Sequence, residues 1–98
     1  MNTVRQNLEN GIITIAKNFV RCDGLLKLNV IEKNKENGIV CAGRENYTMI
    51  DKNVSISNNR RAGIKCVEGA HVSILRNKIS SNFGQGILLV EGTSAHIE

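Results

Sequence analysis

One phrase of the sequence occurs four times, and this repetition limits the folds open to the chain more than any other feature. Each copy fits the pattern Asn-x-(Val/Ile)-x-x-Asn-x-x-x-Gly-Ile, with one additional residue in the third copy. The four glycines, spaced 27, 25 and 23 residues apart, are Gly11, Gly38, Gly63 and Gly86. Repeats of this length are typical of solenoids, in which each repeat buries its apolar face against the next one.

The residues between the glycines favour a β-solenoid over a leucine-rich repeat, the other architecture with this period. The Leu-x-x-Leu-x-Leu frame is absent, and no helical period of 3.6 residues is sustained for three turns. Short bursts of alternating β-branched residues, separated by Asn and Gly, are typical of strands and turns. We therefore predict an all-β fold, a parallel β-solenoid in which each repeat forms one coil.

Equivalent positions of successive coils stack about 4.8 Å apart in such a solenoid. The aliphatic positions should then fill the interior as two columns, which are Ile31, Ile56 and Ile79, and Ile39, Ile64 and Ile87. The second Asn of the pattern has donor and acceptor groups that suit a ladder of hydrogen bonds in a tight turn. The expected Asn ladder is Asn7, Asn34, Asn59 and Asn82. The repeat glycine is expected to supply a backbone φ that a branched residue resists.

The phrase NKISSNFGQGI, residues 77–87, resembles the right-handed parallel β-helix repeat. This repeat occurs in carbohydrate-binding and sugar-hydrolysing proteins, in periplasmic proteins that assemble copper sites, and in the β-helix part of certain F-box proteins. The resemblance extends over residues 2–98 and implies a right-handed parallel β-helix with about four coils of 23–27 residues. We expect a single domain over residues 1–98, either whole or a fragment of a longer solenoid.

The strand after each repeat glycine is apolar on both faces. Because side chains alternate along a strand, the Ile after the glycine should point inward and its neighbours outward. The outward positions are Ile13, Ile15, Val40, Ala42, Lys65, Val67, Leu88 and Val90, of which seven are apolar. Soluble monomers rarely expose a large apolar patch without a use for it, so we predict a protein-binding face. The alternative is that the loop over residues 43–48 covers it.

Two glutamates, Glu68 and Glu91, lie five residues after their repeat glycines and form the one candidate acidic pair. Retaining glycosidases use closely spaced carboxylates. The two earlier coils have Ala16 and Gly43 at this position, and only three residues of the chain are aromatic. The Asp-Asp and His-Gly motifs of pectin-degrading relatives are also absent. We therefore interpret the two glutamates as solvated turn residues and predict no enzymatic activity.

The three cysteines bear on location and on the core. Cys41 and Cys66 each lie three residues after a repeat glycine and are expected to be buried, reduced thiols, with a disulfide between them as the alternative. Cys22 is expected to react with thiol probes. Unpaired thiols and the lack of a signal peptide after Met1 favour a reducing, cytoplasmic location.

Other partners are less well supported. His71 and His96 do not share a repeat position, and the cysteine spacing fits no metal motif, so no metal or cofactor is expected. The net charge is +4, but the basic residues are scattered among acidic ones, which argues against nucleic acid. Apolar runs are too short to span a membrane.

The leading expectation is a non-enzymatic interaction or scaffold module that binds a protein, either another subunit or a second copy. The alternatives are a carbohydrate-binding or carbohydrate-active domain and a self-assembling filament unit.

Overall fold

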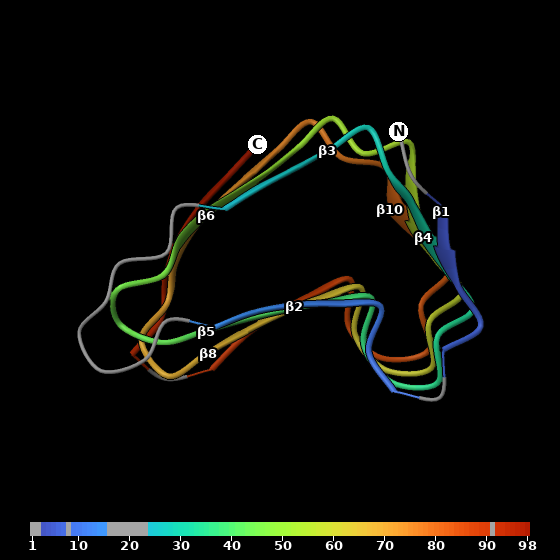
Figure 1. Ribbon diagram of the computed structural model, residues 1–98, viewed down its shortest axis with the longest axis horizontal. Helices are drawn as coiled ribbons and strands as arrows, with labels where there is room; N and C mark the ends of the chain where they lie inside the picture. The colour runs from blue at the N-terminus through green and yellow to red at the C-terminus, as the bar shows by residue number, and fades with distance from the viewer. Residues whose placement is uncertain (1–2, 8, 16–23, 91) are drawn as a thin grey trace.

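The chain winds into four coils, and each coil contributes one strand to each of three parallel sheets (Figure 1). The computed structural model describes residues 3–7, 9–15, 24–90 and 92–98. The first sheet contains β1 (Thr3–Arg5), β4 (Val30–Glu32), β7 (Ser55–Ser57) and β10 (Ile79–Ser80). The second sheet contains β2 (Ile12–Ile15), β5 (Ile39–Ala42), β8 (Ile64–Val67) and β11 (Ile87–Leu89). The third sheet contains β3 (Leu25–Lys27), β6 (Tyr47–Asp51), β9 (His71–Leu75) and β12 (Ser94–Ile97).

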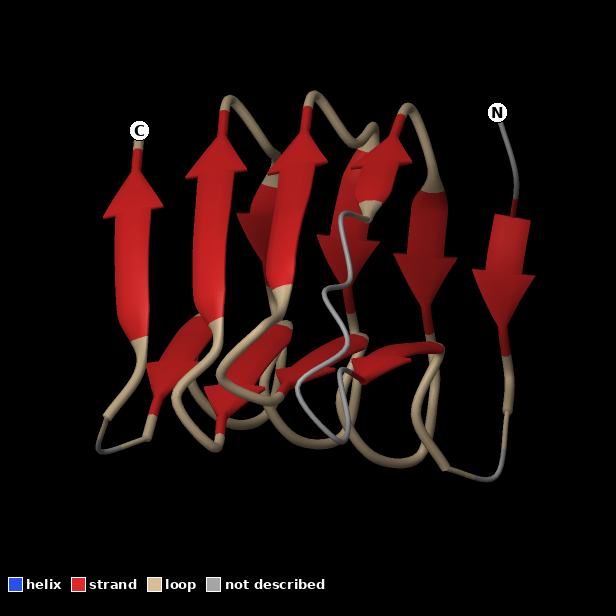
Figure 2. Ribbon diagram, turned by 60° about the vertical axis from the view of Figure 1, so that its left-hand side comes forward, coloured by secondary structure: helices blue, strands red, loops and turns tan. Residues whose placement is uncertain are grey.

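This architecture confirms the predicted all-β parallel solenoid of about four coils. The three sheets enclose a roughly triangular cross-section (Figure 1). Within each sheet the strands run in the same direction, and neighbouring strands come from consecutive coils (Figure 2). Among the residues described, no helix has the length and apolar character needed to cross a membrane.

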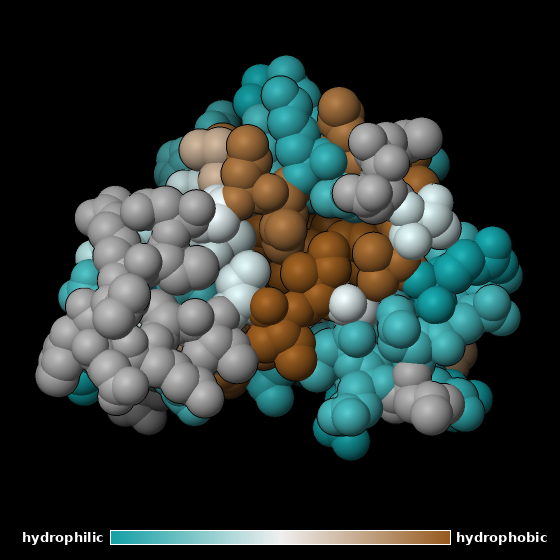
Figure 3. Space-filling view, in the orientation of Figure 1, coloured by the Kyte–Doolittle hydropathy of each residue, from teal (hydrophilic) through white to brown (hydrophobic). Residues whose placement is uncertain are grey.

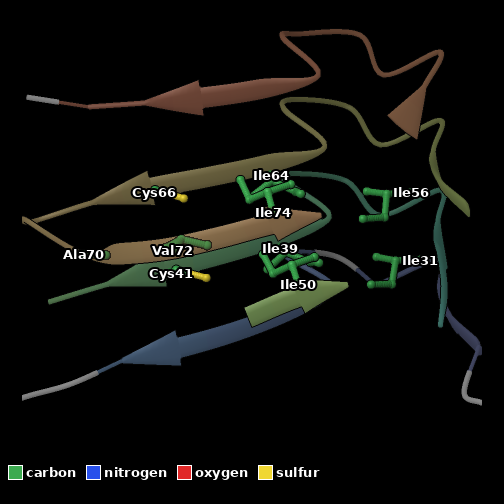
Figure 4. Packing of buried hydrophobic residues seen from close by; sticks show 10 residues of the cluster. All are labelled: Ile31, Ile39, Cys41, Ile50, Ile56, Ile64, Cys66, Ala70, Val72 and Ile74. Carbon is green, nitrogen blue, oxygen red and sulfur yellow. The ribbon is translucent and has the colours of Figure 1, made fainter. Parts of the chain in front are cut away.

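The strand register brings the repeated Ile positions together inside the solenoid. Ile31 pairs with Ile56, and Ile39 pairs with Ile64. All four side chains are fully buried, as Figure 4 shows. The predicted interior columns are therefore confirmed in the two central coils. The predicted members in the fourth coil, Ile79 and Ile87, are only partly buried, because a described coil packs on one side of them alone. The same holds for Ile12 in the first coil, which pairs with Ile39.

The third sheet supplies a third interior column, which the repeat phrase did not predict. Ile50 pairs with Ile74, and Leu26 pairs with Ile50. Ile50 and Ile74 are buried, whereas Leu26 is partly buried against the core. Figure 3 views the molecule in the direction in which the coils stack, and it shows apolar side chains at the centre of the end face with polar residues around them. The core thus consists of three adjoining columns, one from each sheet, which pack into a single cluster.

The predicted Asn residues form a chain of hydrogen bonds at the turns between the first and second sheets. In each pair, Nδ2 of one Asn donates to Oδ1 of the next at 2.9 Å: Asn7 to Asn34, Asn34 to Asn59, and Asn59 to Asn82. Each corner also contains a residue with a left-handed backbone, which is uncommon outside glycine. These residues precede the Asn and are Gln6, Lys33, Asn58 and Ser81.

A second Asn ladder, not predicted as one, joins the coils between the third and first sheets. Nδ2 of Asn29 donates to Oδ1 of Asn53 at 3.2 Å, and Nδ2 of Asn53 donates to Oδ1 of Asn77 at 2.8 Å. These residues occupy the first Asn of the repeat phrase, one residue out of step in the third copy. Both conserved Asn positions within the repeat therefore serve to hold a corner.

Three of the four repeat glycines, Gly11, Gly38 and Gly63, act through close packing, and the expectation of an unusual φ was wrong. The described glycines with positive φ are Gly43, Gly69 and Gly92, none of which is the repeat glycine. A Cβ placed on Gly38 would instead lie 2.7 Å from the carbonyl oxygen of Gly63 and 2.9 Å from Nδ2 of Asn59. The glycine is therefore needed because the next coil passes too close for any side chain.

Candidate functional site

The outer face of the second sheet carries apolar side chains on all four coils. We call five of them the outer strip: Ile13, Val40, Val67, Leu88 and Val90. Ile13 is 50% exposed and Val90 is 40% exposed, and the other three are half-buried. Ile13 and Val40 pair on adjacent strands, and Lys65 lies between Val40 and Leu88. The strip is thus an ordered apolar surface on a rigid sheet.

Two residues predicted for this face, Ala42 and Ile15, are not part of the outer strip. Ala42 is only 7% exposed, so its assignment to the exposed face was wrong. The turn after β5 folds back over it: the backbone N–H of Asn46 donates to the Gly43 carbonyl at 3.0 Å, and Nδ2 of Asn46 donates to the Ala42 carbonyl at 3.1 Å. The side chain of Ile15 lies outside the part of the chain that the structure describes.

A polar hollow of about 630 Å³ lies where the second sheet turns into the third. Its side-chain lining comprises Arg44, Glu45, Tyr47, Glu68 and His71. The predicted partner of Glu68, Glu91, lies outside the described residues, so the acidic pair is not assembled by them. The second carboxylate in the hollow is Glu45, which sequence reasoning missed because the turn of the second coil is longer than that of the third.

Tyr47 and His71 form a stacked ring pair beside this hollow. Their ring centroids are 4.8 Å apart and their planes differ by 8°. The register of the third sheet places Ser94 next to His71 on the following coil. A second hollow of about 230 Å³ lies there, with the rings, Ser73 and His96 along its walls. Aligning the starts of the third-sheet strands, rather than the glycines, would have revealed this pair in the sequence.

The family profile described as "Right handed beta helix region" matches residues 1–98, the whole chain given. The chain belongs to the right-handed β-helix family. Neither a curated protein nor a solved structure matches it. Membership establishes the handedness and the repeat architecture, whereas the function must be argued from the surface of this particular β-helix.

Inside the β-helix, Cys41 and Cys66 pair in register, and both are fully buried free thiols. The hydrogen bond between them, together with burial, raises the pKa of Cys66. The same hydrogen bond lowers the pKa of Cys41 against the opposing effect of burial. Because an isolated thiolate in an apolar core is costly, the pair is best described as two neutral thiols. Cys22 lies outside the described residues.

The two histidines of the β-helix lie on its surface, and both line the second hollow. His71 is half-buried in the ring stack, and His96 is exposed, with Nε2 3.2 Å from Oε2 of Glu98. Over the residues that the structure describes, no group of three or more His, Cys, Asp or Glu side chains is arranged to hold a metal ion.

Proposed function

We propose that this β-helix is a non-enzymatic interaction module that binds a protein through the outer strip, either another subunit or a second copy of the chain. The observation that carries the proposal is the exposure of Ile13 and Val90 on an outer sheet face that has few polar residues. In a strand with one solvated face, apolar side chains that point inward normally alternate with polar side chains that point outward. The outer strip departs from that pattern on every coil.

The structure behind the strip supports the same function. The side chains of the second sheet that point the other way, including Ile39 and Ile64, are locked in the core at 0% exposure. The strip therefore has a fixed geometry, which lowers the entropic cost of binding. Lys65 lies between Val40 and Leu88 in the register, and its aliphatic stem can extend the apolar surface while its ammonium group stays in water.

A double substitution tests the proposal. Val40→Lys with Leu88→Lys should abolish association and hydrophobic-dye binding while leaving the thermal melt of the coil intact. The matched control places two lysines on the outer face of the third sheet, Leu25→Lys with Met49→Lys, at sites 62% and 40% exposed. Sedimentation equilibrium over a concentration series and dye fluorescence are the measurements. A wild-type chain that stays monomeric at high concentration and binds no dye would contradict the proposal.

A second candidate function is carbohydrate binding at the Tyr47–His71 pair. Planar rings beside a polar hollow are suited to stacking and hydrogen bonding with a sugar, and this pair has both. An oligosaccharide array should then detect binding that Tyr47→Ala and Glu68→Ala abolish. Leu25→Ala, an exposed apolar truncation on the same sheet, is the control and should leave binding unchanged. An array without a specific signal would exclude this candidate.

A further inference from the structure

A groove of about 410 Å³ lies at the turns between the first and second sheets, at the lower right of Figure 1. We call it the basic groove, and its lining is Gln6, Lys33, Lys35, Asn58, Arg60 and Phe83. These residues come from all four coils. Three of them are cations and one is aromatic, while none of the described carboxylates lines the groove. It lies on a different surface from the outer strip and from the Tyr47–His71 hollow.

One wall of the basic groove is a column of three side chains that follow the Asn ladder. Lys35, Arg60 and Phe83 each come directly after a ladder Asn. Their backbone N–H groups donate to the ladder residue of the preceding coil: Arg60 to the Asn34 carbonyl and Phe83 to the Asn59 carbonyl, each at 3.0 Å. The ladder therefore fixes the column at one strand spacing per coil, about 4.8 Å.

The three cations of the groove are available to a ligand. Lys33, Lys35 and Arg60 are exposed and have no ion pair with any described carboxylate. Two acidic side chains of these corners are engaged with arginines. Glu36 faces Arg61 at 3.8 Å, and Glu32 faces Arg5 at 4.0 Å. The groove is therefore a local concentration of positive charge on a chain whose charges look evenly scattered in the sequence.

Phe83 sets this groove apart from an ordinary basic surface. It is 73% exposed, more than any other large apolar side chain described. An exposed ring beside cations offers a face for stacking together with charges for an anion. Single-stranded nucleic acid supplies both partners, because each nucleotide has a planar base and a phosphate, and proteins bind it with aromatic platforms in basic grooves.

We propose that the basic groove binds single-stranded nucleic acid, with phosphates at Lys33, Lys35 and Arg60 and a base stacked on Phe83. An acidic peptide without aromatic residues would satisfy the cations but would leave the ring of Phe83 without a planar partner. A duplex presents its bases stacked on each other, so it also leaves Phe83 unused. The proposal differs from the expectation drawn from scattered charges, because coil stacking brings together residues that are far apart in the chain.

Fluorescence anisotropy with a labelled twelve-nucleotide oligothymidylate at low salt tests this inference. Phe83→Ala and Phe83→Leu leave the net charge unchanged, and each should weaken binding about fivefold or more, because the stacked base is lost. Leu25→Ala, which removes an exposed apolar side chain elsewhere, should have no effect. If the Phe83 variants bind as tightly as the wild type, the proposal is overturned.

A second measurement separates this site from general attraction to a basic protein. Arg60→Gln should reduce the slope of log K against log salt by about 0.7, the value for one phosphate contact on a single strand. Lys52→Gln removes a cation that is also exposed but lies outside the groove, and it should leave the slope unchanged. Equal losses in the two variants would overturn the proposal. Competing ligands give a further check. If polyglutamate or a duplex of equal length binds as tightly as the oligothymidylate, with the same dependence on Phe83, the proposal is also overturned.

Discussion

Asn34 donates two hydrogen bonds to a single oxygen, Oδ1 of Asn59: one from Nδ2 at 2.9 Å and one from the backbone N–H at 3.2 Å. Both side chains are fully buried. Among the described residues, no buried side-chain N or O atom lacks a hydrogen-bond partner. The corner of the second coil is thus tied to the third coil by groups that water cannot replace.

Replacing Asn59 with Ala should lower the free energy of unfolding by about 1–3 kcal/mol. The change leaves the backbone N–H and Nδ2 of Asn34 without the Oδ1 acceptor of Asn59. It also removes the hydrogen bond from Nδ2 of Asn59 to Oδ1 of Asn82. Thermal and urea unfolding measure the effect. Lys78→Ala, on the exposed surface, is the control and should change stability little. An Asn59→Ala melt identical to that of the wild type would remove the ladder from the account of stability.

Truncating the Ile that follows the repeat glycine should lower stability more in a central coil than in an outer coil. Ile64→Ala is expected to lower stability by roughly 2–5 kcal/mol, as large cavities in a packed core do, because Ile64 is 0% exposed. Ile12→Ala should cost less, since Ile12 is only partly buried. Native-state hydrogen exchange should likewise show that the backbone amide of Ile64 is better protected than that of Ile12. Equal protection at the two positions would contradict the observed register.

Two repeat glycines provide a matched test of close packing. Gly38→Ala should destabilise the protein by about 1–3 kcal/mol, because its Cβ would lie 2.7 Å from a backbone carbonyl of the next coil. Gly86→Ala places the nearest atom, Cγ2 of Ile79, at 3.5 Å. It should be neutral, or stabilising by about 0.4–1 kcal/mol through the unfolded chain. Similar unfolding midpoints for the two variants would contradict the packing argument.

The buried thiols should be protected from alkylation in the folded state. In a Cys22→Ser background, Cys41 and Cys66 should react with iodoacetamide only as fast as the coil opens, because neither sulfur is exposed and the thiolate is the reactive form. Mass spectrometry before and after addition of denaturant measures the labelling. Rapid labelling of the folded protein would show that the second and third coils open independently of global unfolding.

Much of this fold could be predicted from the sequence, because a solenoid converts spacing along the chain into contacts between coils. The recurring Gly-Ile step and the Asn four residues before the glycine were sufficient to predict the Asn34–Asn59 ladder and the Ile39–Ile64 column. Alternation along a strand then predicted which side of the second sheet would be apolar and outward. These features depend only on the repeat period and on residue chemistry.

The tertiary structure decided what the repeat phrase does not contain. The burial of Ala42 depends on how the turn after β5 folds back, and the role of Gly38 depends on how closely the next coil passes. Arg60 and Phe83 share a repeat position in the sequence, but the groove that they line together with Lys33 depends on how the corners fold. A sequence specifies side chains and their period, whereas distances between side chains on neighbouring coils are set by backbone corners and packing, and only the folded coils determine those.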